Sequence, residues 1–295
     1  MKIGTVSLFL IWMQLTTFAQ EKEKVELKWN FKGNPSLRYE VQVRTEYADV
    51  KQEQLFGFVQ KVIDVDAKGV ATVGVTIDRF RYSTTSGETQ VEYDSEIDGE
   101  KPTDPTAKLL STFVGASYRM EISPQGEYLK FIGMKQMFEK MREGRDEQTQ
   151  ETLKSMEKNF TDESMKQLMG GGTQFLPLKE ISVGESWKSS QTQQNPVLGA
   201  LVAETKYTLQ TIRNGGKEAV VHVEVKMKSD GKAGYALGKS GGTGEFVWDL
   251  TQGVMKSSKV SISMEIWAGE QKFDTKSTVE AKLTPKKKAT QPSDR

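Results

Sequence analysis

The chain has 295 residues, of which 36% are hydrophobic and 27% charged, and its 41 Lys and Arg nearly balance its 40 Asp and Glu. This length suffices for one large β-rich domain or two modest domains. The near-neutral charge argues against nucleic-acid binding, which depends on a basic surface. The lack of Cys excludes disulfides, thiol nucleophiles and the lipid-bearing Cys of a lipoprotein.

The first 19 residues have the pattern of an export signal. Lys2 supplies a positive charge, an apolar run extends from Val6 to Leu15, and Thr17 and Ala19 are the small residues that precede a cleavage site. The run is shorter than the roughly 20 residues of a membrane span. We therefore expect cleavage after Ala19 and a soluble exported protein with no transmembrane span. An uncleaved anchor is the alternative.

Alternating apolar and polar residues predict antiparallel strands, each with one dry and one wet face, along most of the mature chain. The alternation is clearest over residues 39–44, 73–77, 221–227 and 260–266. Turn signals containing Gly separate such segments, at residues 66–69, 123–126, 214–216 and 251–253. The pattern predicts roughly a dozen strands.

The middle of the chain changes to a helical pattern. Met134, Met137, Phe138 and Met141 follow the spacing of one helix face, and a second helix is expected over about 147–160. A shorter helix is predicted over 105–114.

A third helix of this middle segment is predicted from its cap. Thr161 is a typical N-cap, and Asp162 and Glu163 place negative charge in the first turn. Three glycines, Gly170 to Gly172, end the helix.

These elements predict a mainly β protein with a helical insert (α+β), in which Met-rich helices cover a curved antiparallel sheet or incomplete β-barrel. We expect one β-rich domain over 20–284, with two halves (25–132 and 176–284) around a helical insert (133–170), and a disordered basic tail over 285–295. Loosely similar hairpins at 118–132 and 244–264 raise the hypothesis that the halves arose by duplication.

The Met-rich helices have two interpretations. Met fills irregular cores, but its flexible side chain also suits adaptable apolar binding surfaces. The candidate ligand-binding lid consists of Met134, Met137, Phe138, Met141, Met156 and Phe160. The alternative is that these side chains simply complete a core.

A glycine-rich segment, 233–240, matches a relaxed phosphate-loop pattern. Such a loop binds phosphate where a helix opens directly after its Lys and Ser, here Lys239 and Ser240. Glycines and then a predicted strand from Glu245 follow instead. We interpret the segment as a flexible loop and expect neither nucleotide nor cofactor.

Asp94, Glu96 and Asp98, followed by Gly99, resemble the opening of a calcium-binding loop. The position that should hold a bidentate Glu is Pro105, and no flanking pair of helices is evident. We interpret the segment as an acidic, solvated turn and predict no metal centre, with loose calcium binding as the alternative.

His222 is the only His, and the alternation places it on the polar face of its strand beside Glu224. One His without Cys rules out multi-His metal sites, and no Gly-x-Ser-x-Gly elbow accompanies it. No catalytic residue is predicted. Paired carboxylates stay open, because the sequence does not show which acids converge.

Several short motifs resemble a bacterial family of exported proteins, the domain of unknown function family 6263. They are residues 91–95, 122–128 leading into Gly133, Leu176-Pro177, and 183–187. The resemblance covers about Leu27 to Leu283 and implies a periplasmic or extracellular setting, but it brings no established activity. Many members appear as lipoproteins, and the missing Cys departs from that pattern.

The leading hypothesis is non-enzymatic binding of a lipid or other apolar or amphipathic small molecule between the sheet and the helices. One alternative is a structural or interaction module with a packed core and an envelope protein as partner. Another is a hydrolase that uses paired carboxylates.

Overall fold

The computed structural model describes residues 23–285 except 99–101, 103–104, 170–174, 196–197 and 232–233. The predicted signal peptide, Gly170 to Gly172 and all but the first residue of the predicted basic tail lie outside the described residues. No helix in the described part of the chain is long and apolar enough to cross a membrane.

The chain forms a large antiparallel sheet of thirteen strands, with a few short helices. The first half of the chain contributes β2 (Ser36–Tyr47), β3 (Val50–Val65), β4 (Ala71–Ser86), β5 (Thr89–Asp94), β6 (Ser117–Ile122) and β7 (Tyr128–Ile132). The second half contributes β9 (Ser186–Asn195), β10 (Gly199–Arg213), β11 (Glu218–Ser229), β12 (Tyr235–Leu237), β13 (Gly241–Asp249), β14 (Val254–Ala268) and β15 (Gln271–Thr284). A separate small sheet pairs β1 (Lys24–Val25) with β8 (Ile181–Ser182).

The path through the main sheet starts and ends at its centre. The strand order is β7-β6-β4-β3-β2-β15-β14-β13-β11-β10-β9, with β5 beside β4 and β12 beside β14. The chain runs from β2 outward to the edge strand β7, crosses to the opposite edge strand β9, and returns inward to β15, which pairs with β2. The two edges do not pair with each other in the described chain, so the sheet is not closed into a barrel.

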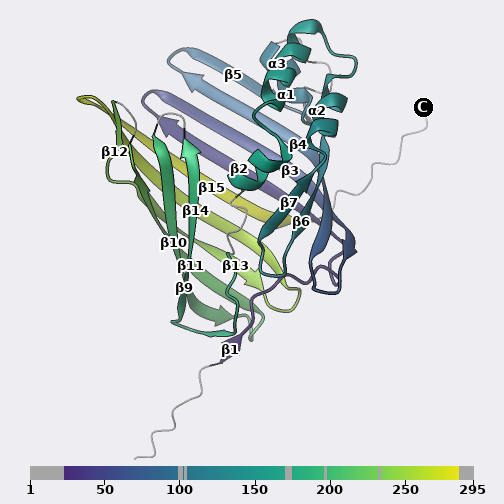
Figure 1. Ribbon diagram of the computed structural model, residues 1–295, viewed down its shortest axis with the longest axis vertical. Coiled ribbons are helices and arrows are strands. Elements are labelled where there is room, and N and C mark those ends of the chain that lie inside the picture. Colours follow the sequence, from purple (N-terminus) through teal and green to yellow (C-terminus); the bar gives the residue numbers. More distant parts are fainter. Residues whose placement is uncertain are drawn as a thin grey trace, which may run out of the picture.

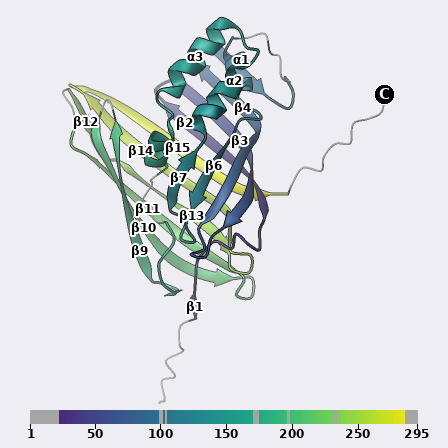
Figure 2. The ribbon, with the colours of Figure 1, turned by 45° about the vertical axis from the view of Figure 1, so that its right-hand side comes forward.

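The sheet folds into a trough with two walls. Both ribbon views show strands β2 to β7 in one wall and strands β9 to β14 in the other, joined through β15 (Figures 1 and 2). We call the faces that point into the trough the inner face. The predicted turns form as expected: the β3–β4 turn, for example, is held by Asp66, whose carboxylate accepts hydrogen bonds from the backbone N–H groups of Lys68 and Val70.

The predicted alternation is seen in the strands. In β11, Val221 and Val223 are buried on the inner face, whereas His222 between them is partly exposed on the other face. The outer face instead carries ion pairs, such as that of Glu280 with Lys259 at 2.9 Å. This division is what places an apolar surface inside the trough.

Two packed cores fill the closed end of the trough. One gathers Leu27, Leu209, Phe246 and Trp248 against the wall of the second half. The other gathers Phe31, Val73 and Phe131 against the wall of the first half. Trp29 packs against both, so the segment before β2 joins the two walls.

Four helices form between β5 and β8: α1 (Pro105–Ser111), α2 (Met134–Arg142), α3 (Glu147–Glu157) and α4 (Asp162–Leu168). The predicted helices at 105–114 and 147–160 each end three residues early, and the chain continues in hydrogen-bonded turns. The predicted cap of α4 is confirmed, because Thr161 Oγ1 accepts a hydrogen bond from Ser164 N at 3.1 Å. Helices α1, α2 and α3 gather at one end of the wall of the first half (Figure 2).

Candidate ligand-binding site

An apolar cavity of about 350 Å³ lies deep in the trough, against the inner face of the wall of the first half. Strands β2, β3, β4, β6 and β7 line it, and β14 and β15 close its far side. Its aromatic lining consists of Trp29, Tyr39, Phe56, Phe58, Tyr118 and Tyr128. Aliphatic and Met side chains from the same strands complete most of the surface, and no lining residue carries a charge.

The polar groups of the cavity are neutral. Tyr39 donates its hydroxyl hydrogen to the Met255 carbonyl at 3.0 Å. The hydroxyls of Tyr118 and Tyr128 have no hydrogen-bond partner among the described residues. Burial, together with the nearby Tyr128 phenol, raises the pKa of Tyr118 to about 12. Burial also raises the pKa of Tyr128, so both phenols stay neutral at physiological pH.

Trp29 supplies another unpartnered donor. Its indole ring lines the cavity and packs edge-on against Trp248, with ring centroids 5.0 Å apart. Its Nε1–H is buried and has no hydrogen-bond partner within the described chain. The Nε1–H faces Gly126, which does not line the cavity, so Trp29 contributes its ring and not a hydrogen bond to the lining.

The apolar inner face extends beyond the deep cavity. The strand register aligns one row of inner-face residues across nine strands: Tyr82, Gln54, Val43, Val279, Val260, Gly244, Val223, Tyr207 and Trp187. The next row toward the open end is Thr84, Gln52, Thr45, Ser277, Ile262, Gly242, Val225, Thr205 and Ser189. The trough thus changes from an apolar floor to a rim of hydroxyl and amide groups, without an Asp, Glu, Lys, Arg or His in either row.

Gly242 and Gly244 allow the sheet to bend between β13 and β14. A Cβ atom on Gly244 would lie 2.2 Å from the Lys259 carbonyl oxygen, and one on Gly242 would lie 2.2 Å from that of Ser261. No side chain larger than hydrogen fits such a close approach of two backbones. The glycines therefore set the curvature that makes the trough.

Helix α4 occupies the space between the two free edges. It packs against the edge strand β7, and the carbonyl of Gln167 accepts a hydrogen bond from Gln191 of the other edge strand, β9, at 3.4 Å. Met165 packs against the cores that contain Met120 and Phe138, and Met169, just after the helix, lines the deep cavity. In Figure 1 this short teal helix lies between the two walls.

The predicted lid residues lie together, but not at the cavity. Met134, Met137, Phe138 and Met141 are each at most 6% exposed and pack with Leu153 in a core of their own. Met156 and Phe160 are partly buried against this core. None of the six lines the deep cavity, so their contact with a ligand stays a prediction.

The residues that do line the cavity were not singled out from the sequence. The alternation in β2 marks Tyr39 and Val41 as inward-facing, and Phe56 and Phe58 alternate in the same way. That signal identifies inner-face residues. It does not distinguish a side chain that faces a cavity from one packed in a core, because the difference depends on the opposite wall.

The calcium-like segment is held by protein groups. Asp94 is 9% exposed rather than solvated, and its carboxylate accepts hydrogen bonds from Glu96 N at 3.0 Å and Arg79 at 3.1 Å. The carboxylate of Asp98 accepts from Asp94 N at 2.7 Å. Arg79 also contacts Glu96 at 3.1 Å, so its guanidinium takes the place that a cation would need.

The structure also gives the positions of His222 and of part of the phosphate-loop-like segment. His222 Nε2 lies 3.7 Å from Glu224 on the outer face. Residue 233 of the phosphate-loop-like segment lies outside the described residues, and strand β13 begins at Gly241, where that motif would need a helix.

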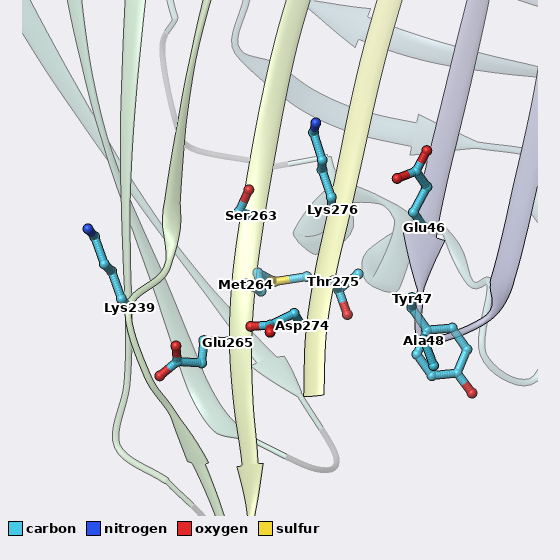
Figure 3. A pocket seen from close by; sticks show the side chains of 10 residues that line it. All are labelled: Glu46, Tyr47, Ala48, Lys239, Ser263, Met264, Glu265, Asp274, Thr275 and Lys276. Atoms are coloured by element: carbon cyan, nitrogen blue, oxygen red, sulfur yellow. The ribbon is translucent and has the colours of Figure 1, made fainter. Parts of the chain in front are cut away.

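A second hollow, of about 440 Å³, lies at the open ends of β2, β14 and β15 (Figure 3). Two of its three carboxylates, Glu265 and Asp274, contact Lys272, with Nζ–O distances of 2.9 and 3.2 Å, and the third is Glu46. The hydrogen bond from Lys272 holds the pKa of Glu265 below its usual value. A general acid needs a raised pKa, so Glu265 is a poor candidate for that role.

The same holds for the other described acids. Each Asp or Glu whose pKa departs clearly from its usual value has a lowered pKa, because N–H donors and cations outweigh any burial. They are Glu53, Asp94, Asp146, Glu204, Glu218, Glu265 and Glu280. Among the described residues no three His, Asp or Glu converge as a metal site would require.

Comparison with known proteins gives a family and a distant likeness to solved structures. No curated protein matches the chain. A solved structure concerned with lipid–protein interactions in lipovitellin aligns with a TM-score of 0.44 and 12% identity, over 85% of this chain and 25% of that chain. This chain thus spans about a quarter of the lipovitellin chain. The model of a family of unknown function (DUF6263) matches residues 68–254, and the chain belongs to that family.

Proposed function

We propose that this protein is an exported, non-enzymatic binder of an apolar or amphipathic small molecule, held in the deep cavity of the trough. The carrying observation is the cavity itself: about 350 Å³ lined by aromatic and aliphatic side chains, with a few neutral polar groups. Small-molecule sites have this composition and a volume of roughly 300–1,000 Å³. The predicted export signal supports a periplasmic or extracellular setting.

The lowered pKa values of Glu53, Asp94 and the five other carboxyl groups named above favour binding over hydrolysis. An interaction module with a packed core would not need an open apolar cavity. That alternative therefore predicts a protein with no bound ligand and no uptake of an apolar probe.

The first test is native mass spectrometry of the mature protein, purified from its own export route, followed by denaturing extraction. Release of a lipid or other small molecule supports the proposal and identifies the ligand class. Uptake of N-phenyl-1-naphthylamine, a probe that fluoresces in apolar surroundings, extends the test to protein that has lost its ligand.

A matched pair of variants ties binding to the cavity. Ala281 lines the cavity from β15, and Lys282 is its exposed neighbour on the outer face. Ala281→Phe fills the cavity and should abolish probe uptake, whereas Lys282→Phe should leave it unchanged. A clean apo mass together with no probe uptake by the wild-type protein would overturn the proposal in favour of an interaction module.

A further inference from the structure

Among the described residues, the two cross-strand rows and the lining of the deep cavity offer no counter-charge for an ionised ligand. The two cross-strand rows and the deep cavity contain neither a cation nor an anion, while the charges of the same strands lie on the outer face. In β2, for example, Tyr39, Val41 and Val43 point inward, and Arg38 turns outward to Asp78 at 2.7 Å. A buried charge without a partner is costly, so this interior penalises a carboxylate or phosphate.

The cavity nevertheless offers hydrogen bonds at one place. The Tyr118 and Tyr128 hydroxyls lack partners among the described residues, and both side chains line the cavity. Both rings pack against Phe131, with ring centroids 5.9 and 6.0 Å from its own, so the two phenols lie on the same side of the cavity. A hydroxyl can both donate and accept a hydrogen bond, so this pair matches an uncharged ligand oxygen.

From this we infer that the deep cavity selects a neutral amphipath, a hydrocarbon chain with an alcohol or ester head, over the carboxylate or phosphate of equal chain length. The head lies at Tyr118 and Tyr128, and the chain lies along the apolar floor. This inference rests on the proposed binding function and adds the ligand class to it.

The test compares decan-1-ol with decanoate, which have the same chain length and differ in head charge at pH 8. Each displaces N-phenyl-1-naphthylamine from the mature full-length protein, and the midpoints give relative affinities. We expect the alcohol to bind at least about tenfold more tightly than the carboxylate. Equal affinities, or a preference for decanoate, would overturn the inference while the binding function stands.

Two variants locate the head group. The double variant Tyr118→Phe/Tyr128→Phe removes both hydroxyls and should weaken decan-1-ol binding several-fold more than it weakens binding of the naphthylamine probe, which carries no oxygen. Tyr82→Phe, on the inner face but outside the cavity lining, should change neither.

The outcomes separate the two levels of the proposal. If neither the probe nor either ligand binds the wild-type protein, the binding function fails. If the alcohol preference holds in wild type but the double variant binds decan-1-ol normally, the assigned position of the head group is wrong.

Discussion

Asp94 illustrates how single residues secure the wall that carries the cavity. Burial alone would raise its pKa, but hydrogen bonds from Glu96 N–H and Arg79 outweigh it, and the pKa is held below its usual value. A carboxyl group with a depressed folded pKa contributes stability above its unfolded pKa, roughly 3.9, and this contribution is lost as pH falls through the folded value. We expect Asp94→Asn to lower the melting temperature at pH 7, and the difference from wild type to shrink below about pH 4. Thermal unfolding monitored by circular dichroism across this pH range measures the difference in melting temperature.

Asp64→Asn, at an exposed position of β3, is the control and should leave the melting temperature unchanged at every pH. A difference for Asp94→Asn that persists undiminished at pH 2 would contradict the linkage.

For single residues, the sequence indicated which face of the sheet a side chain points to, but not which other side chains it contacts. The alternation correctly placed Val221 inward and His222 outward. It could not show that Asp94 is buried, because its partner Arg79 is brought to it only when the β4–β5 hairpin forms. The need for Gly244 was equally hidden, since it arises from the approach of β14.

Among the elements, α4 is the one that connects the edges of the sheet to the cavity. Its N-terminus is held by the reciprocal hydrogen bonds of Thr161 and Ser164, and Met169 lies at its other end. Thr161→Ala should cost about 1 kcal/mol of helix stability, within the range for a lost N-cap. We expect faster hydrogen exchange in residues 162–168. We also expect faster association of N-phenyl-1-naphthylamine, and stopped-flow fluorescence measures this association rate.

The matched control is Asp146→Ala, which removes the cap of α3, a helix with no residue in the cavity lining. Equal effects of the two variants on the association rate would show that α4 does not control access.

The sequence predicted helices α2 and α4 well because the residues that define them are close together in the sequence. Thr161 lies beside the residues that it caps, and the spacing of Met134, Met137, Phe138 and Met141 defines the buried face of α2. The role of the Met stripe depends on what packs against it. Here the partner is α3, so the stripe forms a core, and the cavity is lined by the walls of the trough instead.

The order of the strands across the whole molecule could not be deduced from the sequence. Neighbouring hairpins follow from their turns. The crossing from β7 to β9 instead joins opposite edges of the sheet, and the pairing of β2 with β15 joins segments more than 200 residues apart. The hypothesis of duplicated halves stays a prediction, and the two similar hairpins occupy different places: β6–β7 lies at an edge, whereas β13–β14 lies inside its wall.

The continuous sheet implies that the two halves unfold as one unit. Ten residue pairs join β2 to β15, and Trp29 packs against the cores of both walls.

Val73→Ala, in the first wall, and Val221→Ala, in the second, each remove buried methyl groups. Each should lower the free energy of unfolding by about 2 kcal/mol. Urea unfolding can be followed by far-UV circular dichroism, which reports on both halves. In a Trp29→Phe background it can also be followed by Trp fluorescence, which then comes from Trp187, Trp248 and Trp267 of the second half. Because the halves share one sheet, each variant should shift both midpoints by the same amount, even when the substituted residue and the Trp reporters lie in different walls. If Val73→Ala moved the circular dichroism transition and left the fluorescence transition in place, the halves would be independent domains, and the trough between them would have no fixed shape in which to hold a ligand.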